Sequence, residues 1–215
     1  MRAPDTAMLG ASGYERVEGD FYPTGPENLD CLATFLDLSA MSVWEPACGE
    51  GHLSKRLTQL CRGVVSSDLY DRGYGTAGID FLKSTKLPPV LLGSYGPGRP
   101  GIITNPPYGD MVELFVRHAL ELTRPHGGVV AMFLRNEWDM SSDDRPDLFE
   151  GHPAYAMKVC VTKRPRWVAF KKGDKSPRHN YAWYVWDWSK PAGALPPIRY
   201  IHPRDAAPIG PATVH

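Results

Sequence analysis

The sequence predicts an α/β fold in which helices cover both faces of one mostly parallel sheet. Two observations support this prediction. Short apolar segments alternate with longer segments whose apolar residues recur every three or four positions. Clusters drawn from 21 glycines and 21 prolines separate these segments and indicate turns. Such alternation is typical of strand–helix–strand units, which bury a parallel sheet on both sides.

The expected elements follow one another along the chain. A helix begins near Pro26, and its apolar stripe follows directly; further helices are expected over 51–62 and 112–120. The expected strands cover 42–44, 64–65, 102–104, 129–134, 156–162 and 181–188. No helical pattern separates the last two strands, so we expect them to pair as a hairpin. The polar stretch 135–153 is expected to form a mobile loop or lid.

The chain has 215 residues, a length that suits one large domain. Residues 1–20 show no periodic pattern and are expected to form a flexible leader. The domain itself is expected over 21–188. Residues 189–215 form a proline-rich tail in which no long element is expected.

Composition excludes several classes of protein. The chain has 24 basic and 24 acidic residues, so its formal net charge is zero and it is not a polycation. No apolar run approaches the roughly 18 residues that span a bilayer, and no membrane contact is expected. The four cysteines are widely separated, which indicates a reducing compartment. The seven histidines lack metal-ligand spacing, so no metal ion is expected.

A glycine-containing turn lies between the first expected strand and the next helix. The turn includes Glu45, Ala47, Gly49 and Gly51. Small residues let backbone approach a ligand closely, and helix N–H groups face it. Asp68 ends the next strand, 19 residues after Gly49, where a carboxylate can bind two ribose hydroxyls. The acidic Glu45 suits a ligand with a positive end, such as S-adenosylmethionine (SAM). A nicotinamide cofactor would need its third glycine at Ser54, and a tight turn without a ligand is a further alternative.

A second turn follows the apolar strand 102–104 and contains Asn105, Pro106, Pro107 and Tyr108. Two successive prolines remove donors and stiffen the backbone, so that carbonyl oxygens are held outward. Asn105 adds a side-chain carbonyl acceptor, and Tyr108 adds a flat ring beside it. Two acceptors can hold the hydrogens of a planar amino group while the ring stacks on it. The alternative is a sharp turn with no chemical role.

Together with Asp68 and with Asp80-Phe81, these two turns resemble, in order, the motifs of SAM-dependent amino-methyltransferases. The resemblance covers about residues 20–188 and is greatest to DNA adenine-N6 methyltransferases of the compact phage type. It implies a Rossmann-like, seven-stranded sheet, mostly parallel, with an antiparallel last strand. It also implies an enzyme that transfers a methyl group from SAM to adenine N6 in DNA, with the base flipped from the helix.

The resemblance also implies roles for individual residues. Asn105, Pro106, Pro107 and Tyr108 would be catalytic: the Asn105 side chain and the Pro106 carbonyl accept the amino hydrogens, and Tyr108 stacks on the base. The cofactor would be held by Tyr22, Thr24, Glu45, Ala47, Gly49, Gly51, Asp68, Leu69, Asp80 and Phe81. Within this set, Asp68 would hold the ribose, and Asp80 with Phe81 the adenine. Glu45 departs from the family pattern, which commonly has Asp there.

A basic segment with interleaved aromatic residues runs from Lys158 to Arg178 and contains one acid, Asp174. Basic side chains bind phosphates, and aromatic rings can stack on a displaced base. The residues expected to contact nucleic acid are Lys163, Arg164, Arg166, Trp167, Phe170, Lys171 and Lys172. The alternative is a solvated charged loop with Trp167 packed in the core.

Other substrates and roles stay open at this point. The same chemistry serves RNA bases and protein glutamine amides, and a binding module without catalysis is a third possibility. The basic segment favours DNA as the partner, with RNA second. No long segment follows Trp188, so short or relaxed sequence specificity is expected. We expect a monomer or weak homodimer in the bacterial cytoplasm. Whether a phage or prophage encodes the protein stays open.

Overall fold

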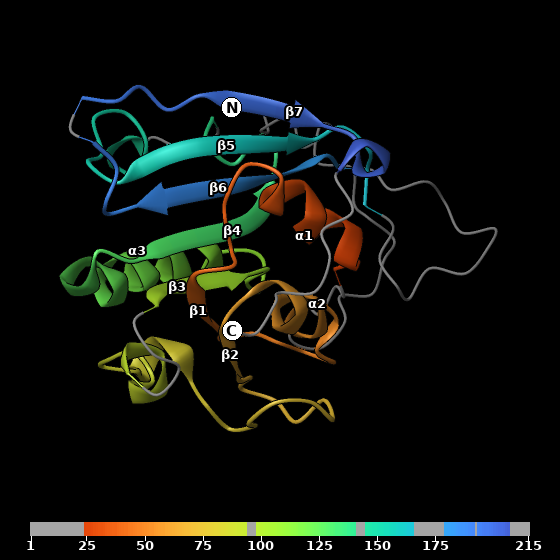
Figure 1. Cartoon of the computed structure of the whole chain (residues 1–215), viewed down its shortest axis with the longest axis vertical. Coiled ribbons are helices and arrows are strands. Elements are labelled where there is room, and N and C mark those ends of the chain that lie inside the picture. Colours follow the sequence, from red (N-terminus) through yellow and green to blue (C-terminus); the bar gives the residue numbers. More distant parts are fainter. Residues whose placement is uncertain (1–23, 94–97, 141–144, 166–178, 192, 207–215) are drawn as a thin grey trace, which may run out of the picture.

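The structure is a computed structural model that describes residues 24–93, 98–140, 145–165, 179–191 and 193–206. It is built on one seven-stranded sheet in the order β2-β1-β3-β4-β6-β5-β7 (Figure 1). The strands are β1 (Met41–Glu45), β2 (Gly63–Ser66), β3 (Arg99–Thr104), β4 (Val129–Arg135), β5 (Tyr155–Val161), β6 (Tyr181–Asp187) and β7 (Ile198–Ile201). The α-helices are α1 (Pro26–Ala33), α2 (His52–Leu60) and α3 (Met111–Thr123). Short 3₁₀ turns are η1 (Phe81–Lys83), η2 (Pro89–Leu92), η3 (Arg124–His126), η4 (Pro146–Leu148) and η5 (Pro203–Asp205).

The direction of the strands confirms the predicted mostly parallel sheet. Strands β2, β1, β3 and β4 run parallel to one another, and β5 pairs in parallel with β7. Strand β6 lies between β4 and β5 and is antiparallel to both. The antiparallel strand is therefore the sixth along the chain rather than the last. Strand β6 pairs with β5 in the opposite direction, as the hairpin prediction requires.

Strand β7 lies inside the proline-rich tail, where no long element was expected. It has four residues and pairs with β5 at the edge of the sheet. Proline is tolerated beside an edge strand because few ladder hydrogen bonds are required there. Pro197 contributes its carbonyl oxygen, which accepts the backbone N–H of Lys158 at 3.1 Å. Composition predicted the shortness of this element but not its pairing.

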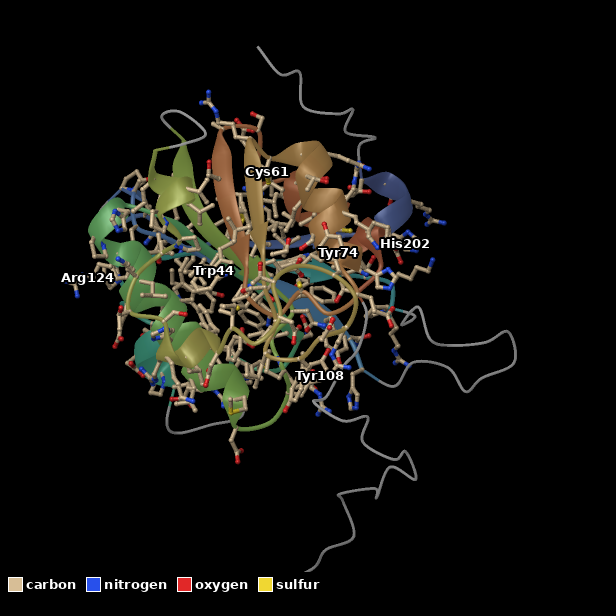
Figure 2. The ribbon with its side chains drawn as sticks, turned by 90° about the horizontal axis from the view of Figure 1, so that it is seen from below. Trp44, Cys61, Tyr74, Tyr108, Arg124 and His202 are labelled. Carbon is tan, nitrogen blue, oxygen red and sulfur yellow. The ribbon has the colours of Figure 1, made fainter. Side chains whose placement is uncertain are left out.

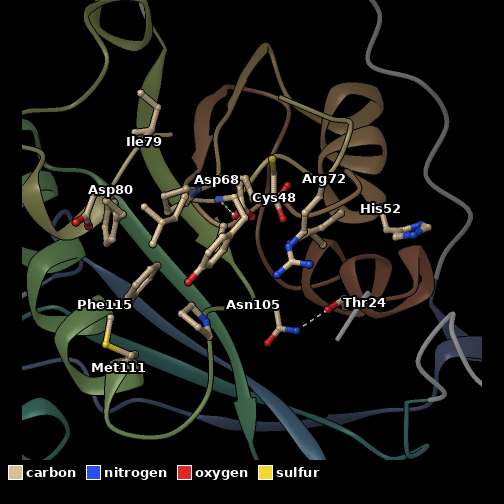
Figure 3. A pocket seen from close by; sticks show the side chains of 18 residues that line it. Thr24, Cys48, His52, Asp68, Arg72, Ile79, Asp80, Asn105, Met111 and Phe115 are labelled. Carbon is tan, nitrogen blue, oxygen red and sulfur yellow. Dashed lines mark hydrogen bonds between the residues drawn. The ribbon is translucent and has the colours of Figure 1, made fainter. Parts of the chain in front are cut away.

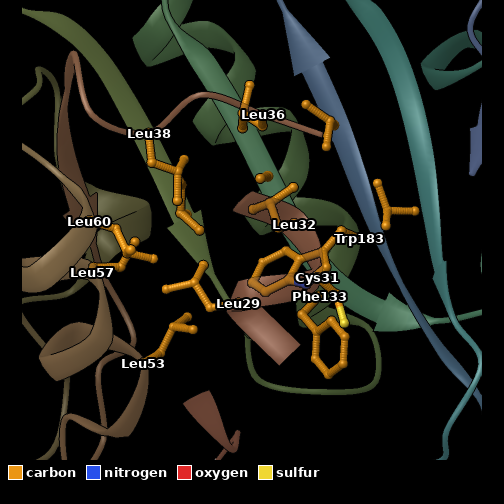
Figure 4. Close-up of a cluster of buried hydrophobic side chains, with 14 of the residues drawn as sticks. Leu29, Cys31, Leu32, Leu36, Leu38, Leu53, Leu57, Leu60, Phe133 and Trp183 are labelled. Atoms are coloured by element: carbon orange, nitrogen blue, oxygen red, sulfur yellow. The ribbon is translucent and has the colours of Figure 1, made fainter. Parts of the chain in front are cut away.

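Two hydrophobic cores lie on the two faces of the sheet. On one face, α1 and α2 pack against Phe133 of β4 and Trp183 of β6 (Figure 4). On the other face, α3 packs against Leu134 of β4 and Trp186 of β6. Alternate residues of β4 therefore enter different cores, which explains why its sequence is continuously apolar. Each fully buried side chain of this size contributes about 1.5–3 kcal/mol.

The stretch expected to be a mobile loop or lid, 135–153, is anchored over its described part. Trp138 packs edge-on against Phe149, with ring centroids 5.6 Å apart. Leu148 of η4 is buried, and its carbonyl accepts the indole N–H of Trp186 at 2.8 Å. Through these contacts, residues 136–140 and 145–153 cover one face of the sheet. The stretch can do so because apolar side chains alternate with its polar side chains.

The two predicted turns lie at the same end of the sheet. Cys61, just before β2, and Tyr108, after β3, lie at opposite ends in Figure 2. The turns singled out in the sequence follow β1 and β3, so they lie at the carboxyl end of the parallel strands. The helices in the described part of the chain are too short or too polar to span a bilayer.

Candidate active site

A pocket opens at the carboxyl ends of β1, β2 and β3. The chain passes from β1 to β2 on one side and returns to β3 on the other, which creates a switch point where ligands of α/β proteins commonly bind. Residues from both predicted turns line this pocket (Figure 3). The lining residues are Thr24, Glu45, Pro46, Ala47, Cys48, His52, Leu53, Asp68, Leu69, Tyr70, Arg72, Ile79, Asp80, Phe81, Asn105, Pro107, Met111 and Phe115.

The glycine turn has the conformation that its residues predict. Gly49 and Gly51 have φ values of 53° and 78°, in the left-handed region that favours glycine. A Cβ on Gly51 would lie 2.4 Å from the Tyr74 ring, so the turn also needs glycine for space. The Gly51 N–H donates to the Cys48 carbonyl at 2.8 Å, and α2 begins at the next residue.

Asp68 connects this turn to the loop after β2. Its Oδ2 accepts the Gly49 backbone N–H at 2.8 Å, and its Oδ1 accepts the Tyr70 N–H at 2.9 Å. The residue is 8% exposed and lines the pocket. Because a carboxylate oxygen can accept more than one hydrogen bond, both oxygens keep capacity for hydroxyl groups of a ligand.

Glu45 is the most buried acid in the described pocket lining, at 2% exposure. Its carboxyl group accepts a hydrogen bond from the Ser54 hydroxyl, which also lies 2.6 Å from the Ser66 hydroxyl. Burial raises the pKa of Glu45 well above its usual value, and the negative charge of Asp68 adds to the rise. The Ser54 hydrogen bond acts in the opposite direction. A positively charged ligand group would favour the ionised form.

Asn105 is held at the pocket by Thr24, the first of the described residues. Its side-chain Nδ2 donates to the Thr24 hydroxyl at 3.0 Å (Figure 3). Pro107 also lines the pocket, whereas Pro106 is buried and is not among the lining residues. Tyr108 is not among the lining residues; its ring packs edge-on against Tyr181 of β6 at 6.2 Å. Of the four predicted catalytic residues, Asn105 and Pro107 therefore form the wall in this structure.

Asp80 and Phe81 lie on the opposite side of the pocket. Asp80 caps η1 by accepting the Leu82 N–H at 3.1 Å, and its other oxygen lies 3.0 Å from the Lys83 ammonium group. Phe81 is 2% exposed and packs between Trp44 and Phe115. The more accessible apolar side chains at this end are Leu69, Tyr70, Ile79 and Met111.

Several lining residues were not singled out in the sequence. Ile79 and Tyr70 are close neighbours of Asp80 and Asp68, so their places in the chain were a usable signal. Arg72 had no such signal, because it lies in a loop without periodic pattern. Figure 3 shows its guanidinium group directed into the pocket, between Cys48 and Asn105 in that view. Its carbon Cζ also lies 5.4 Å from the centroid of the Tyr70 ring.

The basic segment is described only in part. Lys163 and Arg164 are exposed, and Arg164 donates to the Asn180 side chain at 3.1 Å. Tyr22, Arg166, Trp167, Phe170, Lys171 and Lys172 lie outside the described residues.

Lys158, the first basic residue of that segment, has a different role. It is 2% exposed, and its ammonium group donates to both Asp139 oxygens at 2.9 and 2.8 Å and to the Asn136 carbonyl at 2.6 Å. Lys158 begins the basic segment but is not among the residues expected to contact nucleic acid, and its charge is paired inside the fold. Within the described chain, no three His, Cys, Asp or Glu side chains are placed to hold a metal ion.

No protein-family model and no curated protein matches this sequence. Solved structures do. Three of them are a type I restriction-modification methyltransferase subunit from Streptococcus thermophilus, a Pyrococcus horikoshii protein described as an RNA methyltransferase, and the modification subunit of a Vibrio vulnificus protein described as a type I restriction enzyme. Their identities to this chain are 16%, 18% and 14%, with TM-scores of 0.54, 0.55 and 0.53.

The aligned regions cover 80%, 81% and 90% of this chain and 46%, 91% and 48% of the respective proteins. This chain therefore spans about half the length of the two type I proteins and nearly all of the Pyrococcus protein. At these identities the likeness concerns the fold, which is the Rossmann-like fold of methyltransferases.

Proposed function

We propose that this protein is a SAM-dependent methyltransferase that modifies the N6 amino group of adenine in DNA. The observation that supports this most strongly is the meeting of Glu45, Asp68 and Asn105 in one pocket at the switch point of the sheet. The three side chains lie at the carboxyl ends of three different strands, so an ordinary turn motif does not account for their convergence. Glu45 and Asp68 suit a nucleoside with a cationic end, and Asn105 suits a planar amino group.

The pocket offers suitable groups for each part of SAM. The Asp68 oxygens suit the ribose hydroxyls, and the apolar surfaces of Leu69 and Ile79 suit the adenine ring. The buried carboxyl group of Glu45 suits the ammonium group, and the Arg72 guanidinium suits the carboxylate. When bound there, SAM supplies a methyl group on a sulfonium centre, which the target nitrogen accepts as one of its protons leaves to water.

The target base is assigned to the Asn105 side of the pocket. The Asn105 Oδ1 and the Pro106 carbonyl accept the two amino hydrogens and so orient the nitrogen lone pair. The Tyr108 ring, positioned by its edge contact with Tyr181, stacks on the base. Flipping the base out of the duplex costs a few kcal/mol, which phosphate contacts of Lys163, Arg164 and the later basic residues of the segment offset. Rate enhancement then comes from positioning in a preorganised polar pocket.

RNA is the second candidate substrate, because the Pyrococcus protein described as an RNA methyltransferase aligns over 91% of its own length. The deciding experiment incubates the protein with methyl-labelled SAM and, in parallel, with duplex DNA, single-stranded DNA, RNA and a protein mixture. We expect label in DNA, recovered as N6-methyladenine after digestion. Sequencing of the modified adenines gives the context. Label only in RNA, or only in glutamine amides, would contradict the DNA assignment.

Asn105→Ala is the matched control for this experiment. We expect it to abolish transfer while SAM binding persists, because the glycine turn and Asp68 do not depend on the Asn105 amide. Activity within a factor of two of the parent at saturating SAM would contradict the catalytic role of Asn105.

A further inference from the structure

The side chains of Thr24 and Asn105 are joined by a hydrogen bond although they lie 81 positions apart in the sequence. The Asn105 Nδ2 donates to the Thr24 Oγ1 at 3.0 Å, and Thr24 is only 4% exposed. Both residues line the pocket, Thr24 just before α1 and Asn105 just after β3. The contact therefore connects the segment that enters the fold to the turn that carries the proposed chemistry.

Thr24 is itself held in place by the start of α1. The next residue, Gly25, accepts hydrogen bonds on its carbonyl from the backbone and side chain of Asn28, each at 3.1 Å. The Asn28 carbonyl accepts the indole N–H of Trp183 at 2.7 Å, and Trp183 is fully buried in β6. A chain of hydrogen bonds thus fixes Thr24 relative to the sheet, and Pro26 restricts the backbone at the same point.

We propose that Thr24 is the positioning residue for Asn105. A planar side-chain amide rotates about its terminal torsion unless a partner fixes its plane. The target amino group offers hydrogens, so Asn105 must present its oxygen to the target and its nitrogen elsewhere. The hydroxyl of Thr24 accepts a hydrogen bond from that nitrogen. Because the amide is planar, Oδ1 then points away from Thr24. This role rests on the proposed function, and it adds a residue that acts through Asn105 rather than on the substrate.

Two substitutions separate the hydroxyl from the shape of the side chain. Thr24→Val keeps the shape and removes the acceptor, whereas Thr24→Ser keeps the acceptor and removes one methyl group. A lost hydrogen bond of about 0.5–1.5 kcal/mol corresponds to a rate reduced about two- to tenfold. We expect that loss in single-turnover methyl transfer by Thr24→Val at saturating SAM, where a changed SAM affinity does not affect the rate. Thr24→Ser should restore the rate to within about twofold of the parent.

A second measurement does not require activity. The side-chain amide protons of Asn105, assigned by their absence in Asn105→Ala, should be shifted and slow to exchange in the parent and in Thr24→Ser. Thr24→Val should lose both properties. Thermal unfolding of each variant shows whether it is folded, and Thr24→Ala replaces Thr24→Val if the latter is not.

The outcomes are distinguishable. Equal rates for the parent and Thr24→Val, equal losses for Thr24→Val and Thr24→Ser, or a loss of SAM affinity alone would overturn the positioning role. Absence of transfer by the parent on every substrate contradicts the proposed function, and this inference with it, before any substitution is made. Loss of the rate and of the amide signature together in Thr24→Val, with recovery in Thr24→Ser, supports it.

Discussion

The Asp68 carboxylate accepts the backbone N–H of Gly49 at 2.8 Å, across 19 residues of sequence. The contact makes the glycine turn and the end of β2 one unit before any ligand is present. The other oxygen of Asp68 holds the Tyr70 N–H, so the same side chain also fixes the start of the next loop. A carboxylate proposed to bind ribose therefore also shapes the walls around the ribose.

Asp68→Ala should weaken SAM binding by about 1–3 kcal/mol, because hydrogen bonds to a charged group are lost. The same change leaves two backbone N–H groups without their acceptor, so the free energy of unfolding should fall as well. Asp68→Asn keeps one acceptor oxygen and should lie between the parent and Asp68→Ala in both respects. Calorimetric titration with SAM and urea unfolding measure the two effects. Unchanged SAM affinity in Asp68→Ala would show that the ribose is held elsewhere.

Arg72→Ala should weaken SAM binding about tenfold, because a hydrogen bond to a charged group contributes about 1.5–3 kcal/mol and this side chain is partly exposed. Methylthioadenosine, which lacks the amino-acid part of SAM, is the discriminating ligand and should bind parent and variant equally. Arg72→Lys keeps the charge without the bidentate geometry and should be intermediate. Equal losses for the two ligands would mean that Arg72 shapes its loop instead of binding the carboxylate.

The sequence placed Glu45, Asp68 and Asn105 each at the end of an expected strand. The structure brings them to one edge because the carboxyl ends of parallel strands meet. The sequence did not predict Arg72, because the path of a loop without periodicity depends on tertiary contacts. One of these is the hydrogen bond from the Asp68 N–H to the Thr76 carbonyl at 3.0 Å. The contact between Thr24 and Asn105 could not be predicted either, since no local sequence pattern relates the two positions.

The buried cation Lys158 shows a different limit. In the sequence it begins a run of basic residues, and charge alone does not reveal which members of a run point inward. Its acidic partner, Asp139, lies in a stretch that composition predicted to be a mobile loop. Edge strand β7 was missed for a related reason: proline content predicts what a segment cannot form, whereas pairing depends on the strand that it meets.

Lys158→Met should lower the free energy of unfolding by about 3 kcal/mol, because removal of one partner leaves the other charge poorly compensated. Asp139 keeps 19% side-chain exposure, which places the expected loss at the lower end of the range for buried pairs. Lys163→Met, at an exposed position of the same segment, should change stability by less than about 0.5 kcal/mol. Urea unfolding of both variants measures the difference. Equal stability of the two would show that the Lys158 pair contributes nothing to the fold.

Glu45→Gln should become more stable than the parent as pH rises. Burial holds the pKa of Glu45 well above its usual value of 4.5, so the folded state binds a proton that the unfolded state releases first. The favourable contribution of Glu45 is therefore complete below pH 4.5 and is lost as pH rises through the folded-state pKa. Glutamine fills the same space without a charge and does not titrate.

Urea unfolding of the parent and Glu45→Gln at several pH values between 5 and 8 tests this directly, and the difference in free energy of unfolding should widen toward pH 8. Ser54→Ala is the informative second variant, because the Ser54 hydrogen bond stabilises the ionised carboxyl group. Its loss should raise the folded-state pKa further, so that the decline of stability continues to higher pH than in the parent. SAM affinity should fall in Glu45→Gln, since the proposed partner of the ammonium group is then neutral. Parallel pH profiles for the parent and Glu45→Gln would show that this carboxyl group is ionised at no cost to the fold.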